Sequence, residues 1–277
     1  METILVPTDF SRNAENALKY AVDLAKKEGA KIILMHACHN NYINSDVPYF
    51  EIGDVLVKTR KDSKKMLKAI VQEFIEPENI PYETMIVEEF PVEAISLVLA
   101  ETEVDLIVMG TKGSSGIMGT VFGSNTATVI ERVKVPVMAI PESAPFHPIK
   151  KITYATSYFK SDFEALARVV EIAEPYDAQL NLLHITDGKN SSESERVLME
   201  TFIAEAKVRA PYEKMNFELV TDENTEHALQ KYMDDASVEM LVMSTHHRDF
   251  FDKIFGKSYT QQMAYHTKIP LLAFHHG

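Results

Sequence analysis

Residues 104–133 read VDLIVMGTKGSSGIMGTVFGSNTATVIERV, and this stretch decides the fold class. The apolar run VDLIVM predicts a buried strand, and SNTATVIERV predicts an amphipathic helix. Between them, residues 110–123 hold five of the chain's ten glycines. A glycine-rich turn that joins a strand to a helix is typical of an α/β protein whose backbone approaches a phosphate group.

The pattern around this stretch occurs twice in the chain. Residues 16–37 align with residues 164–185 at seven identical positions of 22. Further along, VDLIVMGT at 104–111 aligns with VEMLVMST at 238–245 at four positions of eight. Both matches come in the same order, so we interpret the chain as the duplication of a whole domain.

A proline-rich stretch separates the two copies. The segment PESAPFHPIK at 141–150 holds three prolines, which a helix or a central strand does not tolerate. We therefore place the linker there. The sequence predicts one domain over residues 1–142, the first copy, and another over residues 149–277, the second copy.

Short apolar runs alternate with amphipathic segments inside each copy. In the first copy the expected strands are 2–7, 31–37, 82–89, 104–110 and 135–140, and the expected helices are 11–29, about 54–75, 91–103 and 124–133. Ser11 is the expected N-cap of the first helix. This alternation predicts two tandem, open, parallel five-stranded sheets with helices on both faces, a Rossmann-like α/β arrangement.

Ligands of open parallel sheets bind outside the carboxyl ends of the strands, where the strand order reverses. Three segments of the first copy end at that edge. The first strand ends at Pro7, Thr8 and Asp9, the second at Ala37, and the fourth at Met109 and Gly110. We expect them to converge on one crevice.

The glycine loop matches neither of the two commonest phosphate-binding signatures. A Walker A loop needs a glycine followed by Lys and Ser or Thr, and no glycine here is followed by that pair. A dinucleotide fingerprint follows the first strand, whereas this loop follows the fourth. The spacing present is Gly110-x2-Gly113-x9-Gly123-Ser124.

That spacing resembles the nucleotide-binding signature of the universal stress protein family, G-x2-G-x9-G-[ST]. The N-terminal ILVPTDFS, the His-Ala end of the second strand and PVMAIP as the last strand agree with the family as well. The resemblance covers the whole chain as two consecutive family domains. It implies an adenine nucleotide alpha hydrolase-like fold and binding of ATP, or of ADP or AMP, with or without Mg²⁺.

The resemblance also implies a role for each part of the site. Asp9 and Ala37 would hold the adenine and ribose, and the loop and the helix start would hold the phosphates. Bare glycines let backbone N–H groups approach the phosphates, and a helix N-terminus favours negative charge. The expected nucleotide-binding residues are Pro7, Thr8, Asp9, Ala37, Met109, Gly110, Lys112, Gly113, Gly123, Ser124, Asn125 and Thr126. Three alternatives stay open: Asp9 as a helix cap, Ser124 as an N-cap only, and a solvated Lys112.

The second copy departs from the signature. Ser157, Ser244 and His247 stand where the first copy has Asp9, Gly110 and Gly113, and Phe250 and Phe251 add bulk to the loop. Of the signature glycines this loop keeps only Gly256. We expect this degenerate copy to bind no ATP in the manner of the family. Since the family's domains commonly pair through their fifth strands, the second copy would act as a built-in partner of the first, and a further homodimer stays open.

Several histidines raise the question of a metal. His246, His247, His275 and His276 could gather near the ends of the last two strands, and imidazole suits zinc. They form adjacent pairs, however, and adjacent strand residues point to opposite faces. We predict no metal site and leave these four open. His36 and His184, at the ends of aligned strands, are expected to be hydrogen-bonded core residues.

Composition excludes other classes of protein. The net charge of −13 argues against a nucleic-acid surface. The chain has one cysteine, Cys38, and no apolar run that approaches the ~20 residues of a membrane span. Its first residues lack a secretory pattern. We expect a cytoplasmic protein with no nucleic-acid or membrane partner.

Three classes of function remain. The favoured class is a nucleotide-binding stress-response protein that acts as a sensor or regulator. A slow ATPase is the second, although residues 104–130 hold no Asp or Glu except Asp105, which sits in a strand, and no catalytic constellation is recognisable. A scaffold that binds no nucleotide is the third.

Overall fold

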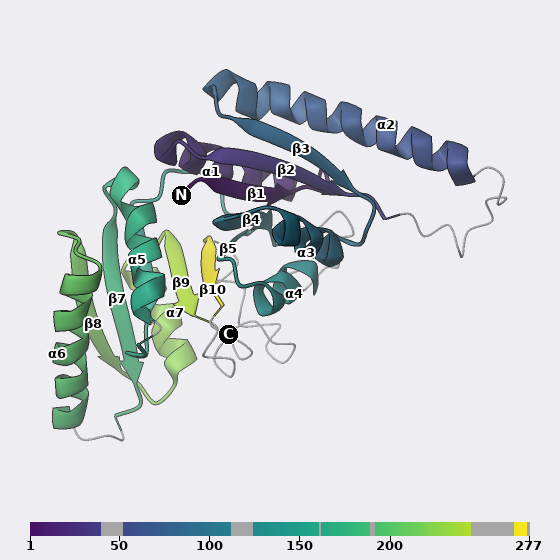
Figure 1. Ribbon diagram of the computed structural model, residues 1–277. Helices are drawn as coiled ribbons and strands as arrows, with labels where there is room; N and C mark the ends of the chain where they lie inside the picture. Colours follow the sequence, from purple (N-terminus) through teal and green to yellow (C-terminus); the bar gives the residue numbers. More distant parts are fainter. Residues whose placement is uncertain (40–51, 112–123, 161, 189–191, 245–268, 276–277) are drawn as a thin grey trace.

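The computed structural model of the chain describes residues 1–39, 52–111, 124–160, 162–188, 192–244 and 269–275 (Figure 1). The first copy contains β1 (Thr3–Pro7), α1 (Arg12–Glu28), β2 (Lys31–Ala37), α2 (Ile52–Ile70), β3 (Tyr82–Val87), α3 (Pro91–Glu101), β4 (Leu106–Gly110), α4 (Ser124–Arg132) and β5 (Val137–Ile140). The second contains β6 (Lys151–Ala155), α5 (Asp162–Ala173), β7 (Gln179–Thr186), α6 (Ser192–Arg209), β8 (Met215–Thr221), α7 (Thr225–Asp235), β9 (Met240–Ser244) and β10 (Leu271–Phe274). The strands and helices expected in the first copy are confirmed. The expected helix that ends at about residue 75 is α2 followed by a π-helical turn, Val71–Ile75.

All ten of these strands lie in one sheet, in the order β3-β2-β1-β4-β5-β10-β9-β6-β7-β8. Each half is parallel, and the halves join where β10 runs antiparallel to β5, with Leu272 opposite Met138. The sequence predicts two five-stranded sheets, and the structure fuses them edge to edge (Figure 1). An isolated β5 or β10 would be an apolar sheet edge with unpaired N–H and C=O groups, and the ladder removes both edges.

Alternation along the strands divides the core between the two faces of the sheet. On one face, residues such as Ile4, Val6 and Ile152 pack with α1, α2, α5 and α6. On the other, residues such as Leu5, Ile107 and Leu241 pack with α3, α4 and α7. Both clusters contain residues of both copies, so apolar burial runs without a break across the junction of β5 and β10.

The predicted linker lies against α1. The Asn16 amide donates a hydrogen bond to the Ala144 carbonyl at 2.6 Å, and the Tyr20 hydroxyl donates to the Pro145 carbonyl at 3.0 Å. The ring of Phe146 packs edge-on against Tyr20. The proline-rich stretch is therefore fixed to the first copy by two side chains one helical turn apart.

A tyrosine of the second copy packs on the same helix. Tyr176 lies in the short segment Glu174–Tyr176 after α5, and the Lys27 ammonium stands 4.7 Å from its ring centroid. Lys27 also donates to the Pro175 carbonyl at 3.2 Å. Burial raises the pKa of Tyr176, and its hydrogen bond to the Asp23 carboxylate raises that pKa further. The neutral phenol is thus the form that the folded chain keeps.

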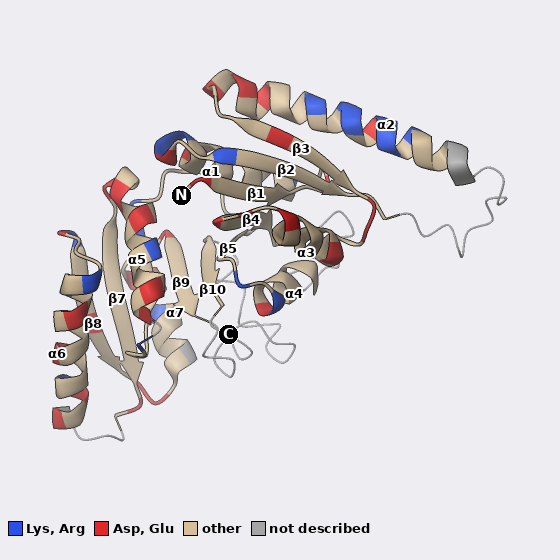
Figure 2. Ribbon diagram, viewed as in Figure 1, with Lys and Arg blue, Asp and Glu red and all other residues tan. Residues whose placement is uncertain are grey.

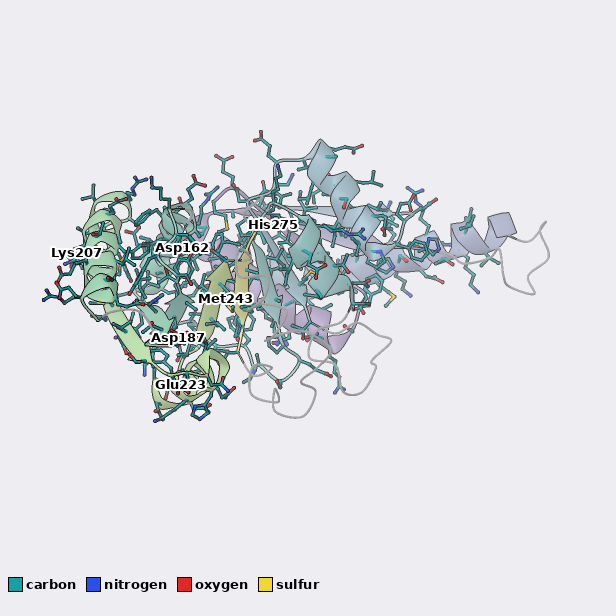
Figure 3. All side chains as sticks on the ribbon, turned by 90° about the horizontal axis from the view of Figure 1, so that it is seen from below. Asp162, Asp187, Lys207, Glu223, Met243 and His275 are labelled. Carbon is teal, nitrogen blue, oxygen red and sulfur yellow. The ribbon has the colours of Figure 1, made fainter. Side chains whose placement is uncertain are left out.

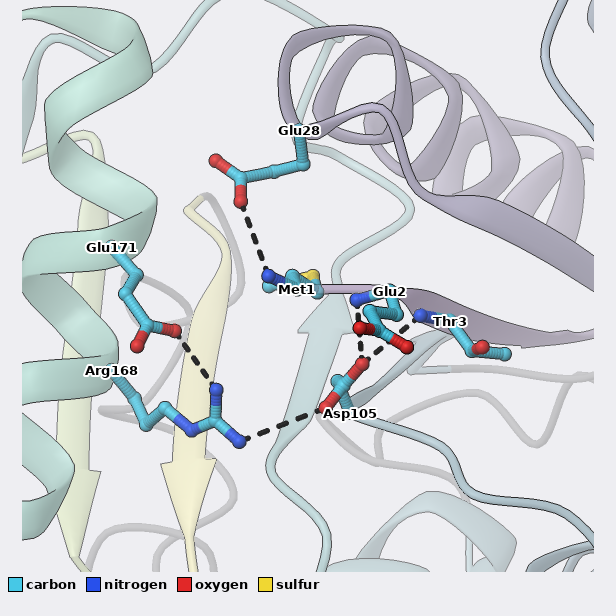
Figure 4. A network of polar contacts seen from close by, with 7 residues as sticks. All are labelled: Met1, Glu2, Thr3, Glu28, Asp105, Arg168 and Glu171. Atoms are coloured by element: carbon cyan, nitrogen blue, oxygen red, sulfur yellow. Dashed lines mark hydrogen bonds and ion pairs between the residues drawn. The ribbon is translucent and has the colours of Figure 1, made fainter.

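A second polar contact between the copies centres on Asp105, which precedes β4 (Figure 4). One carboxylate oxygen accepts the backbone N–H groups of Glu2 at 2.7 Å and Thr3 at 3.0 Å. The other lies 3.7 Å from the Arg168 guanidinium of α5, which also pairs with Glu171 at 2.9 Å. Burial by itself raises the pKa of Asp105, but these N–H groups and Arg168 lower it overall. One carboxylate therefore ties β1 and β4 to the second copy.

Within the described residues, no helix combines the length and the apolar character that crossing a membrane requires.

We expect Tyr176→Phe to change the pH dependence of stability. In the unfolded chain a tyrosine loses its proton near pH ~10, whereas the buried Tyr176 keeps it. Above that pH the unfolded state binds fewer protons, so the free energy of unfolding falls by about 1.4 kcal/mol per pH unit from this group. Its stabilising contribution is complete below pH ~10 and is lost as the pH rises.

Urea denaturation of the wild type and Tyr176→Phe, from about pH 8.5 to about pH 11, measures this effect. The free-energy difference between the two proteins should shrink as the pH rises. A difference that stays constant over this range would contradict the burial of a neutral phenol.

Candidate functional site

The strand order of the first copy reverses between β1 and β4. β1 pairs with β2 on one side and with β4 on the other, and the chain continues from β2 to β3 but from β4 to β5. Pro7 and Gly110 end these two neighbouring strands, and Ala37 ends β2 beside them. The described parts of the three predicted segments therefore share the sheet edge at which open α/β sheets hold ligands.

Hydrogen bonds fix the backbone after β1 in one conformation. The Thr8 N–H donates to Met35 at 2.8 Å, and the Thr8 carbonyl lies 2.8 Å from His36 Nδ1. Phe10 has a positive φ of 64°, which is uncommon for a residue with a side chain. Its N–H donates to the Thr8 hydroxyl at 3.1 Å, and its ring lies tilted against the His36 ring, with 4.3 Å between the ring centroids. The positive φ of Phe10 strains this turn, and the Thr8 hydroxyl and the His36 imidazole hold the strained backbone in place.

Asp9 lies at the tip of this turn. Its Oδ1 accepts the Ser11 N–H at 3.0 Å, while Ser11 itself caps α1 by accepting the Ala14 N–H at 3.2 Å. The expected N-cap Ser11 is confirmed. Asp9 supports the turn before the cap, and its carboxylate sits at the sheet edge next to the start of α1.

The second copy repeats the same turn with different side chains. His184 Nδ1 lies 2.8 Å from the Thr156 carbonyl, as His36 does from Thr8. Tyr158 has a φ of 64°, its N–H donates to the Thr156 hydroxyl, and its ring stacks 4.1 Å from His184. The expectation that His36 and His184 are hydrogen-bonded is confirmed. Since both copies share it, the Thr–aromatic–His arrangement belongs to the fold, whereas Asp9 is specific to the first copy.

Gly110, at the end of β4, lies close to Asn13 of α1. A Cβ at this position would lie 2.7 Å from Asn13 Nδ2 and 2.8 Å from its Cγ, and Asn13 is buried. A side chain at residue 110 would thus overlap Asn13. From the sequence, Gly110 is expected to let a ligand touch the backbone, and the structure adds a packing requirement that spacing could not reveal.

The start of α4 combines exposed and buried polar residues. Ser124 and Asn125 are exposed, whereas Thr126 is buried and its hydroxyl donates to the Gly110 carbonyl at 2.9 Å. That hydrogen bond holds the helix start against the end of β4. It uses the one hydroxyl proton of Thr126, which leaves only oxygen lone pairs for a ligand.

The other predicted residues differ in what they offer. Met109 is buried in the core cluster on the face of α3 and α4, and Ala37 packs against the same cluster. Both can offer a ligand their backbone at this edge. Lys112, Gly113 and Gly123 lie outside the described residues.

In the second copy, a cluster of polar side chains lies around Ser244, the residue that aligns with Gly110. Tyr154, which aligns with Val6, places its hydroxyl 3.1 Å from Asp162 Oδ1 and 3.0 Å from the Ser244 hydroxyl. Asp162, labelled in Figure 3, also accepts from the Thr156 hydroxyl at 2.7 Å. All four residues are buried, and burial raises the pKa of Tyr154 well above its usual value. The serine that replaces Gly110 is therefore engaged inside the fold.

Sequence reasoning missed Asp162, although a signal was present. It missed this residue because Asp162 is the first residue of α5, and acidic residues at a helix start usually serve the helix dipole. The signal was Tyr154 inside β6. The hydroxyl of a buried tyrosine needs a hydrogen-bond partner, and Asp162 follows Tyr154 by eight residues.

Most of the four histidines considered above as metal ligands lie outside the described residues. His246, His247 and His276 lie outside the described residues, and His275 follows β10. Within the described part of the chain, no group of three or more histidine, cysteine or acidic side chains is placed to hold a metal.

We expect Gly110→Ala to destabilise the protein by about 1–3 kcal/mol, the usual cost of overpacking. The added methyl group would overlap the Asn13 side chain, which has little room to move. Urea denaturation measures the loss. In the double variant with Asn13→Ala the cost should be smaller than the sum of the two single costs, since the overlapping group is gone. Strict additivity would contradict the contact.

Comparisons with known proteins come out as follows. A family model described as the Universal stress protein family matches residues 1–141 and again residues 148–275. A universal stress protein of Methanocaldococcus jannaschii, MJ0577, is 28% identical over 152 residues, which are 50% of this chain and 93% of the relative. A universal stress protein structure from Archaeoglobus fulgidus covers 99% of this chain and 98% of its own, at 18% identity and a TM-score of 0.72, and so shows the fold.

A second similar structure is described as a universal stress protein in complex with cAMP. It covers 47% of this chain and 98% of its own, at 18% identity and a TM-score of 0.37.

Proposed function

The chain belongs to the universal stress protein family, with two tandem copies of its domain, and from this premise we propose that the first copy binds an adenine nucleotide and acts as a nucleotide-dependent sensor or regulator. ATP, ADP or AMP, with or without Mg²⁺, is the ligand of this proposal. The division into domains over residues 1–142 and 149–277 and a cytoplasmic location are parts of it.

One observation carries the proposal. The chain holds the complete spacing Gly110-x2-Gly113-x9-Gly123-Ser124. Of its described ends, Gly110 closes β4 beside the point where the strand order reverses, and Ser124 begins α4, which a Thr126 hydrogen bond holds to Gly110. Asp9 lies at the end of the neighbouring strand β1, at the same edge. A carboxylate suits the hydroxyl and amino donors of a nucleoside, and a helix start suits its phosphates.

The second copy serves in this proposal as a fixed partner and not as a second site. The cluster of Tyr154, Asp162 and Ser244 supports this role, because it fills the equivalent place with satisfied polar groups. The antiparallel ladder between β5 and β10 supports it too, because it gives the first copy a permanent neighbour. Nucleotide binding in the first copy would then be read out by partners of the joined sheet.

We expect one adenine nucleotide per chain at saturation. The test is to purify the protein under native conditions, denature it and quantify the released nucleotides, and then to titrate emptied protein with ATP. Two nucleotides per chain would contradict the vacancy of the second copy. A protein that arrives empty and takes up none would overturn the proposal.

We expect Asp9→Ala to weaken nucleotide binding by about 1–3 kcal/mol, as the loss of a charge-assisted hydrogen bond does. Asp9→Asn keeps an oxygen acceptor for the Ser11 N–H but removes the negative charge. It therefore separates the effect of the charge on binding from the effect of the turn. Ser157→Ala, at the aligned position of the second copy, is the matched control and should leave the affinity unchanged. Isothermal titration calorimetry measures all three. Equal losses in Asp9→Ala and Ser157→Ala would remove Asp9 from the site.

The same material distinguishes a sensor from an enzyme. With labelled ATP we expect binding with little turnover, since no Asp or Glu other than Asp105 lies among residues 104–130, and Asp105 is engaged with β1 and Arg168. If the wild type hydrolyses ATP repeatedly and Asp9→Ala abolishes this turnover, the ATPase alternative is favoured.

A further inference from the structure

Helix α2 carries a dense cationic surface on an acidic protein. Residues 58–68, KTRKDSKKMLK, contain six basic residues and one acidic residue, whereas the whole chain has a net charge of −13. The six are exposed: Lys58, Arg60, Lys61, Lys64, Lys65 and Lys68. Figure 2 shows this band of positive charge along the outer helix at the β3 end of the sheet. We call these six residues the α2 basic face.

The orientation of α2 is set by the side chains that it buries. Ser63 and Leu67 are buried, four residues apart, and α2 contacts β2 and β3. Residues three, four and seven apart share one side of a helix, so Lys58, Lys61 and Lys65 line one side, and this is the side opposite the buried Ser63 and Leu67. At 1.5 Å per residue the stretch spans about 15 Å. The basic face is thus a straight, rigid stripe and not a flexible tail.

Within the described part of the chain, no carboxylate lies within ion-pair distance of the lysines of this stripe. Among the described residues, one ion pair involves the stripe, from Arg60 to Glu88 at 3.0 Å. The other five basic residues have none there. Like charges three and four apart repel each other, so the arrangement costs stability in the isolated protein.

The duplication supplies an internal comparison. α6 follows β7 in the second copy as α2 follows β2 in the first, and it lies on the same face of the sheet. Its arginines are neutralised within the helix: Arg196 pairs with Glu193 at 2.8 Å, and Arg209 with Glu205 at 3.3 Å. The same place in the same fold therefore does not require a cluster of six cations, and α2 departs from it.

We propose that the α2 basic face is a docking surface for an acidic helical segment of another protein. Carboxylates at the same helical spacing would meet Lys58, Lys61 and Lys65 side by side. Val57, 70% exposed and four residues before Lys61, adds an apolar contact on the same side of the helix for a protein partner. This proposal is independent of the nucleotide site.

Charge and packing favour a short acidic segment over a larger polyanion. The apolar side of α2 is buried against the sheet, so the helix has no apolar face to insert into a membrane. A long nucleic acid or a membrane surface would also meet the acidic remainder of the protein. Fields are screened beyond about 8 Å at physiological salt, so a partner confined to the stripe meets mainly its positive field.

The test is fluorescence anisotropy with a labelled peptide. The probe is an acetylated helical peptide of about 20 residues, built from Ala and Leu with Glu at positions i, i+3, i+4 and i+7. A second peptide carries Gln in place of each Glu. We expect the full-length protein to bind the Glu peptide and not the Gln peptide, with affinity that falls as salt rises from about 0.05 to about 0.3 M.

Two charge-matched variants locate the binding. Lys58→Glu/Lys61→Glu/Lys65→Glu should lose about tenfold or more in affinity, since three exposed ion pairs become repulsive. The control, Lys134→Glu/Lys207→Glu/Lys231→Glu, alters three exposed lysines elsewhere by the same net charge and should stay within about twofold. Circular dichroism and an unchanged urea midpoint show that both variants fold.

Three results would overturn the proposal. The wild type fails to bind the Glu peptide, the control variant loses as much affinity as the α2 variant, or duplex DNA or phosphatidylserine vesicles bind the α2 face more tightly than the peptide does. The last result would assign the surface to a different class of partner.

Discussion

The structure depends on the antiparallel ladder between β5 and β10. Both strands are short and wholly apolar, VMAI and LLAF, and every residue in them is buried. Left apart, each would be an exposed sheet edge with unpaired backbone groups. Joined, they let one hydrophobic cluster run across each face of a ten-stranded sheet. The contacts of α1 with the linker and with Tyr176, and of Asp105 with Arg168, lie beside this junction.

The duplication helps to assign roles to residues. Features that both copies share, such as the Thr8 and Thr156 turns with their histidines, answer to the fold. Features present in one copy answer to something else. Asp9 and the bare backbone at Gly110 occur only in the first, and the second has Ser157 and a serine bound to Tyr154. The α2 basic face is a third difference, since α6 neutralises its own arginines.

The buried polar groups at the carboxyl edge of the sheet also differ between the two copies. Thr126 and Asp162 are both buried, and each is hydrogen-bonded at the carboxyl edge of the sheet. Such groups are costly when unpaired, so their partners specify the local geometry. In the first copy this geometry holds the helix start of α4 against β4. In the second copy, the hydrogen bonds of Asp162 hold the start of α5 against Tyr154 and Thr156.

The sequence by itself determined the strand and helix order, the duplication, the family and the edge of the sheet at which a ligand would bind. These follow from periodicity, spacing and glycine placement, which are local along the chain. Only the tertiary structure decided that the two sheets fuse, that Gly110 must be bare because of Asn13, and that the Thr126 hydroxyl is bound to Gly110. It also decided which basic residues of α2 form an ion pair within the described part of the chain. Each of these depends on side chains far apart in the chain, whose proximity no local pattern encodes.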